Sequence, residues 1–285
     1  PRPRTEFGQG CGILRHSAAP GVYRHWRYAP PIELADWIEH FWLEEWRFDS
    51  SVPQTREVLP HPSVQMVFAA NRSRIYGVQL GRFVRQLAGN DRIFGIKFRP
   101  GAFHPFLRKP VSAMANTSVL ATEVFPDAAD AEREVLACCD DGEMVQAATR
   151  FLVARLPPRD SHAQRARRMV EEIARDSSIT RVEHLTVRWD IHERSLQRLF
   201  DRYVGASPRW VIKRYRIYEA LESVGVAAQT GWAELAQNLG YFDQAHFIND
   251  FKKLVGCSPG EYARPLPDGD DADTQLDLSM AAGLR

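Results

Sequence analysis

The sequence predicts an α+β protein of two parts, an N-terminal antiparallel β-sheet or barrel with added helices and an all-α C-terminal domain. Three observations lead to this fold class. Short runs rich in β-branched and aromatic residues fill much of the first 100 positions, with turn-forming residues between them. Helical periodicity dominates after residue 161. The Pro-Pro pair at 157–158 separates the halves, and 285 residues are enough for about two domains.

In the N-terminal half, five runs have the composition of strands, and Asn71, Gly81 and Gly89 stand between runs as hairpin turns require. The runs cover residues 41–48, 64–69, 75–80, 83–87 and 93–98. From residue 127 to 156 the pattern becomes helical. We therefore expect a β-rich domain over 1–126, and a helical segment with a linker over 127–160.

Two segments near the C-terminus share one internal plan. Residues 185–200 (LTVRWDIHERSLQRLF) and 235–251 (LAQNLGYFDQAHFINDF) each combine a short helical pattern, a tight break and a polar-faced helix that ends in Phe. Gly240 at the second break favours a left-handed backbone, and Asp190 at the first can adopt one at modest cost. This is the plan of a helix-turn-helix unit, and two such units in one chain indicate DNA binding.

The outer faces of the two polar helices carry side chains suited to reading bases. Arginine can bond a guanine edge bidentately, and glutamine or asparagine an adenine edge, in the major groove. In an isolated helix a solvated polar face would be the better interpretation, but the second copy favours DNA. The candidate base contacts are Arg194, Gln197 and Arg198 on the first helix, and Gln244, Ala245, His246 and Asn249 on the second.

Helix starts are visible in the pattern. Thr180 and Glu183 have the spacing of a capping box, while Ser207 as N-cap and Pro208 in the first turn predict a long helix between the units. At roughly 1.5 Å per residue it spans about 25 Å, and can set two recognition helices about 34 Å apart, one turn of duplex. Basic residues on and beyond it are candidate phosphate contacts, with ordinary surface charge an equally good interpretation of each. These candidates are Arg209, Lys213, Arg214, Arg216, Lys252 and Lys253.

Residues 165–264 resemble the DNA-binding domain of AraC/XylS-type transcription regulators. The resemblance rests on SLQRLFDRYVGASP in the first unit and, more diagnostically, on LGYFDQAHFINDFKKLVGCSPGEYAR in the second. It implies a seven-helix domain over residues 161–264, with base-facing roles for the seven residues named above. Asn249 stands where members of this family often carry Arg, which argues against strong guanine reading by the second helix.

Many AraC-like regulators have a cupin-like N-terminal barrel that binds a small effector, followed by helices that pair two protomers. The resemblance implies both roles here, with 127–160 as the dimerisation segment. It also implies promoter DNA, RNA polymerase and an unidentified small-molecule effector as partners. An aromatic pocket is one interpretation of the tryptophan-rich barrel sequence, and ordinary core packing is the commoner one. The pocket candidates are Trp26, Trp42, Trp46, Arg56, Phe68 and Phe98.

Other kinds of site find little support. The histidines of the N-terminal half are scattered, with no HxH pair, so neither a metal nor another cofactor is expected. Adjacent Cys138 and Cys139 suit packing better than redox sensing. No GxSxG or Walker-type motif assembles a catalytic centre, and we expect no enzyme activity. Without a signal sequence or membrane span, the expected location is cytoplasmic, in association with the bacterial nucleoid.

The formal net charge of +1 means that DNA affinity must come from the local placement of basic residues. Residues 265–285 form an acidic stretch that is expected to be disordered. Together these patterns predict a sequence-specific transcription regulator controlled by a small effector. The competing interpretation is a ligand-binding or catalytic barrel whose helical domain mediates protein contacts only.

Overall fold

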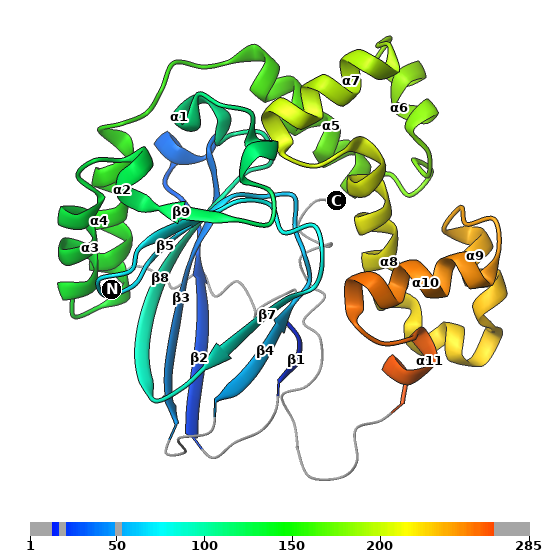
Figure 1. Ribbon diagram of the computed structural model, residues 1–285, viewed down its shortest axis with the longest axis horizontal. Coiled ribbons are helices and arrows are strands. Elements are labelled where there is room, and N and C mark those ends of the chain that lie inside the picture. The colour runs from blue at the N-terminus through cyan, green and yellow to red at the C-terminus, as the bar shows by residue number, and fades with distance from the viewer. Residues whose placement is uncertain (1–12, 17–20, 49–52, 265–285) are drawn as a thin grey trace.

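The computed structural model describes residues 13–16, 21–48 and 53–264. A β-sheet domain lies between two groups of helices, with α2, α3 and α4 on one side and the C-terminal helices α5 to α11 on the other (Figure 1). The acidic segment 265–285 and Cys11 lie outside the described residues. The expected fold class is confirmed, since an antiparallel β-rich half precedes an all-helical half.

Within the described residues, nine strands form two antiparallel sheets that face each other (Figure 1). The six-stranded sheet has the order β2 (Gly21–Tyr28), β3 (Ile38–Phe48), β8 (Asn90–Phe98), β5 (Gln65–Phe68), β6 (Arg74–Tyr76) and β9 (Ser118–Leu120). The three-stranded sheet has the order β1 (Ile13–His16), β4 (Gln54–Val58) and β7 (Phe83–Leu87). Four of the five expected runs coincide with strands. The fifth, 75–80, is a strand only as far as Tyr76.

The two faces of β3 pack into different environments, as the alternation of side chains along a strand requires. Phe41 and Leu43 face an apolar core that is closed by α3 (Ala128–Ala137) and α4 (Asp141–Val153). Trp42 and Trp46 face the space between the two sheets. The six-stranded sheet therefore separates an apolar core on its helical side from a mixed interior on the other.

Short helices complete this domain. They are η1 (Ile32–Leu34), α1 (His104–Leu107), η2 (Val111–Met114) and α2 (Ala121–Val124). The expected helical segment 127–156 is divided in two at residues 138–140, where Asp140 caps α4 by accepting a hydrogen bond from the Glu143 amide. Val135 and Leu152, both fully buried, pack against the sheet of the same chain.

Seven α-helices make the C-terminal domain. They are α5 (Ser161–Arg175), α6 (Val182–Arg188), α7 (Glu193–Leu199), α8 (Pro208–Thr230), α9 (Trp232–Asn238), α10 (Gln244–Val255) and α11 (Pro259–Tyr262), with a π-turn η3 (Phe200–Val204) after α7. Ser207 caps α8 through the Trp210 amide, as expected. The prediction of a capping box at Thr180 and Glu183 is wrong, because α6 starts after Arg181 without a side-chain cap.

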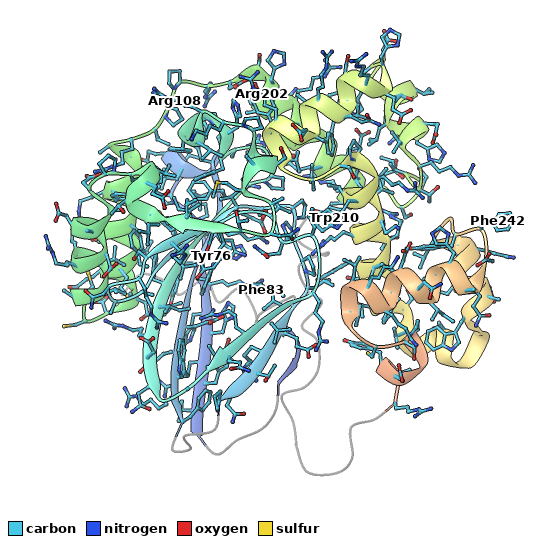
Figure 2. The ribbon with its side chains drawn as sticks, in the orientation of Figure 1. Tyr76, Phe83, Arg108, Arg202, Trp210 and Phe242 are labelled. Carbon is cyan, nitrogen blue, oxygen red and sulfur yellow. The ribbon has the colours of Figure 1, made fainter. Side chains whose placement is uncertain are left out.

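The two domains pack closely along α8. Trp210 Nε1 donates to the Leu80 carbonyl oxygen at 2.9 Å, and Arg214 Nε donates to the Pro60 carbonyl oxygen at 2.7 Å. Val78 is fully buried among residues of the helical domain. Figure 2 shows Trp210 between α8 and the β-sheet domain.

We predict that Gly95→Ala destabilises the protein by about 2 kcal/mol, the usual cost of overpacking a core. Gly95 lies opposite Trp42 on β3, and a Cβ at this position would overlap the indole ring. Urea unfolding followed by tryptophan fluorescence measures the change. Gly81→Ala is the matched control, because an added Cβ there meets no atom within 4 Å. Equal stability of the two variants would contradict the packing.

Candidate nucleic-acid interface and interior of the β-sheet domain

The first helix-turn-helix unit is α6, a tight turn and α7. Asp190 adopts the left-handed conformation at the turn, with φ of 44°, and the Ile191 amide donates to the Thr186 carbonyl at 3.1 Å. Leu185 of α6 and Leu196 of α7 are fully buried. These apolar contacts fix the angle between the helices and turn the opposite face of α7 outward.

The predicted base contacts of the first unit all lie on that outward face. Arg194, Gln197 and Arg198 are exposed. Their hydrogen bonds are local: Gln197 Nε2 donates to Glu193 at 2.9 Å, and Arg198 makes only a long contact of 3.4 Å with Ser195. Such bonds between exposed groups are weak, so a base edge can replace them at little cost.

The second unit is α9, a turn at Gly240, and α10. Gly240 has φ of 78°, and a Cβ there would lie 2.5 Å from the Thr180 Cβ, so both its backbone angle and its surroundings require glycine. Asp243 caps α10 by accepting from the His246 amide at 2.7 Å. Phe247 and Phe251 are fully buried anchors on the inner face.

The outer face of α10 presents the remaining predicted base contacts, Gln244, Ala245, His246 and Asn249, all of them exposed. His246 is the most constrained, because its Nε2 lies 3.3 Å from an Asp250 carboxylate oxygen. Asp250 is only 3% exposed, and the same oxygen pairs with Lys213 Nζ of α8 at 2.7 Å. This chain of contacts ties the second recognition helix to the helix that links the units.

The predicted phosphate contacts divide into two groups. Arg209, Lys252 and Lys253 are exposed. For Arg214 and Arg216 the prediction is wrong in this conformation, since they are only 4% and 2% exposed. The reason is that α8 is covered by the β-sheet domain on one side and by the other helices of its own domain on another, and these two guanidinium groups lie on the covered sides.

Each of these inward groups has protein partners. Arg214 lies over the rings of Tyr215 and Tyr218 and donates to Pro60, whereas Arg216 donates to the Ile173 carbonyl at 2.7 Å and pairs with Glu219 at 2.9 Å. The Lys213 ammonium is also engaged, in its pair with Asp250.

The six predicted pocket residues do not gather in one place. Trp42, Trp46 and Arg56 face the interior between the sheets. Phe68 and Phe98 lie on the opposite face of the six-stranded sheet, fully buried in the apolar core, and Trp26 packs against that same core. The pocket prediction is therefore wrong for these last three residues. Alternate positions of a strand face opposite sides, and composition alone does not reveal which side is the interior.

Charged side chains that the sequence interpretation missed cross the interior from sheet to sheet. Glu44 of β3 accepts from Arg85 of β7 at 2.9 Å and lies 3.7 Å from His25. In a second, half-buried pair, Lys97 contacts Glu39 at 2.9 Å. Burial lowers the pKa of His25 to about 4, which leaves the imidazole neutral near pH 7. The sequence signal that could have predicted a polar interior was the alternation of tryptophan and charged residues along one face of β3.

Tyr76 of β6 and Phe83 of β7 also meet between the sheets, with ring centroids 6.5 Å apart (Figure 2). In the part of the chain that the structure describes, no group of three His, Cys, Asp or Glu side chains is placed to hold a metal ion. Among the same residues, no helix has both the length and the apolar character needed to cross a membrane.

Two family models match the chain. Residues 185–265 match one described as a helix-turn-helix domain, and residues 26–120 match one described as a domain of unknown function, DUF6597. No curated protein matches the sequence.

Solved structures show similarity to both halves. The C-terminal domain of AraT, a response regulator from Geobacillus stearothermophilus, aligns over 41% of this chain and 96% of its own, with 23% identity and a TM-score of 0.32. ToxT from Vibrio cholerae, bound to an unsaturated fatty acid, aligns over 76% of this chain and 89% of its own, with 12% identity and a TM-score of 0.34. ToxT bound to (E)-4-(8-methylnaphthalen-1-yl)but-3-enoic acid aligns over 85% of this chain and 98% of its own, with 11% identity and a TM-score of 0.35.

Two helix-turn-helix units with exposed polar recognition helices, together with the matching family model, define the class of this protein as a DNA-binding transcription regulator. More particularly, its C-terminal region is a helix-turn-helix domain of the AraC type.

We predict that Arg216→Ala lowers the free energy of unfolding by about 3 kcal/mol, because it removes one partner of a buried ion pair. Arg209→Ala, on the exposed side of the same helix, is the control and changes stability by less than about 0.5 kcal/mol. Urea denaturation of both variants is the measurement. Unchanged stability of Arg216→Ala, with weaker binding to every DNA sequence, would restore the phosphate role.

Proposed function

We propose that this protein binds specific promoter sequences through α7 and α10, and that a small molecule in the N-terminal domain controls this binding. The observation that carries the proposal is the outward position of every predicted base contact on two helices whose apolar sides are buried. A helix that enters the major groove needs a polar outer face on a rigid support. We assign the protein no catalytic role.

In this proposal the first unit supplies most of the sequence specificity. Arg194 and Arg198 can each bond a guanine edge bidentately, and Gln197 can bond an adenine edge. The second unit offers Gln244 and Asn249, which suit adenine, and a histidine held by Asp250. Unequal chemistry on the two helices predicts an asymmetric site, with a guanine-containing half and an adenine-rich half.

Phosphate contacts come from the exposed basic residues. Arg209 is in the first turn of α8, and Lys252 and Lys253 are in the last turn of α10. Arg209 follows the first recognition helix in the chain, and the two lysines lie at the C-terminal end of the second, where phosphate contacts can set the register of a helix in the groove. Their small number fits the low net charge of the chain.

The contact between the domains gives the effector a route to the DNA. Pro60 and Leu80, which accept hydrogen bonds from α8, belong to loops that join strands of the two sheets. A molecule that changes the spacing of these sheets moves both loops and therefore α8. Because α8 connects the two units, its displacement alters how both recognition helices meet the duplex.

Pairing of two protomers and contact with RNA polymerase stay predictions. The apolar positions of α3 and α4 pack inside the chain, so a dimer through these helices has to use their outer surface. Sedimentation of the full chain at micromolar concentration tests the dimer, and a monomer would contradict it.

We predict that Gln197→Ala and Arg198→Ala each weaken binding to the specific site by about 1–3 kcal/mol and leave binding to random duplex nearly unchanged. Arg209→Ala weakens both alike and reduces the slope of log K against log salt by about 1. Genomic fragments selected by the full chain provide the specific site, and titrations at several salt concentrations measure the affinities.

Arg133→Ala is the matched control for these variants. It removes the same charge from an exposed position on α3, in the other domain, and leaves both affinities unchanged. Equal loss on specific and random duplex for Arg198→Ala would reject base reading by α7. Absence of any preferred fragment would favour a helical domain that contacts proteins only.

A further inference from the structure

A buried guanidinium in the interior between the sheets has two nitrogen atoms without a hydrogen-bond partner among the described residues. Arg56 of β4 is 7% exposed, and within the described residues its Nε and Nη1 have no acceptor. One face of the group stacks on the ring of Tyr23, with Cζ 4.3 Å from the ring centroid. The stacking contact satisfies the face of the cation but not the N–H groups at its edge.

Three acidic side chains of the β-sheet domain form ion pairs with other residues. Glu44 pairs with Arg85 and lies near His25, and Glu39 pairs with Lys97. The neighbour of Arg56 along β4, Glu57, pairs with Arg82. Each of these three carboxylates therefore has a basic partner other than Arg56.

A second arginine lies beside Arg56 in the sheet. Arg85 of β7 is the direct cross-strand partner of Arg56, and both side chains reach from the three-stranded sheet to the six-stranded one. Like charges at opposed positions in a sheet repel each other. Burial lowers the pKa of Arg56 to about 10, so this side chain remains charged near pH 7.

A buried, unpaired cation beside another cation is unfavourable unless an anion completes the site. We propose that the interior between the sheets binds a small organic carboxylate, with its charged end on Arg56 and its apolar body against the tryptophans of β3. The planar fork of arginine matches the two oxygens of a carboxylate. Trp42 and Trp46 belong to an apolar cluster beside it, as the body of such a ligand requires.

This inference rests on the proposed function, because it names the chemical class of the effector. The position of Arg56 also connects the ligand to the domain contact. Four residues further along the chain, Pro60 accepts the hydrogen bond from Arg214 of α8, and Leu59 packs into the core of the second unit. A carboxylate that binds Arg56 therefore acts on β4, and the residues that follow this strand contact the helical domain.

The test measures ligand binding by the full chain without DNA. Tryptophan fluorescence and thermal unfolding are followed during titration with straight-chain carboxylates from acetate to dodecanoate, with benzoate and phenylacetate, and with the primary amides of the responding acids. Inorganic phosphate forms a separate arm. We expect at least one acid to raise the unfolding temperature, and its amide to have at least tenfold weaker affinity. No response to any acid, equal response to the amide, or response to phosphate alone would overturn the proposal.

The variant Arg56→Met separates recognition from folding. We expect it to bind the responding acid at least tenfold more weakly, and to be at least as stable as the wild type without ligand, since it replaces an unpaired buried charge. Arg47→Met, which removes an arginine with 70% of its side chain exposed on β3, is the control and keeps full affinity. Full affinity in Arg56→Met, or loss of its folded state, would show that Arg56 serves another purpose.

The two proposals fail independently. Loss of acid binding in Arg56→Met without any DNA preference in the wild type would reject the regulator and keep the anion site. Sequence-specific DNA binding by a chain that binds none of the acids would keep the regulator and reject the anion site.

Discussion

The packing of α8 against both the β-sheet domain and the other helices of its own domain is the constraint on which the arrangement of this molecule depends. Helix α8 joins the helix-turn-helix units, and it is also the element that the β-sheet domain grips through Trp210 and Arg214. Arg216 on its other side is anchored in the helical domain. Because both domains use the same helix, neither can shift against it without changing the orientation of the DNA-reading surface.

The six-stranded sheet divides the N-terminal domain into two environments with different purposes. On its helical side the side chains are apolar and closely packed, as in the cluster of Phe41, Phe68 and Phe98. On the side that faces the three-stranded sheet, tryptophans alternate with ion pairs such as Glu44 with Arg85. Stability comes mainly from the first side, because apolar burial is the larger favourable contribution and buried ion pairs contribute little net. Side chains on the second side contribute less to stability, so they can be polar and can serve ligand recognition.

Local patterns predicted several local features correctly, although the capping box expected at Thr180 and Glu183 does not form. The cap at Ser207, the left-handed turns at Asp190 and Gly240, and the outward face of α7 all follow from residues within one or two helical turns. Long-range contacts could not be predicted in this way. An arginine on a basic helix has the same pattern whether it meets solvent or, like Arg214, a carbonyl oxygen 154 positions away.

The strands show the same limit. Strand β4 reads Gln-Thr-Arg-Glu-Val, which has too few apolar residues to be recognised, so the strand that carries Arg56 was missed. Trp42 and Phe68 were both expected in a pocket, yet they face opposite sides of one sheet. Only the pairing of strands β3, β8 and β5 determines those sides.

The contact between Gly240 and Thr180 has a consequence for the modularity of the C-terminal domain. The turn of the second unit rests on the segment that leads into the first, with no room for a side chain at position 240. The two units are therefore not interchangeable cassettes. A chimera that takes its second unit from another regulator must bring a compatible residue at position 180 with it, and a bulkier residue there would force the units apart before either met its operator.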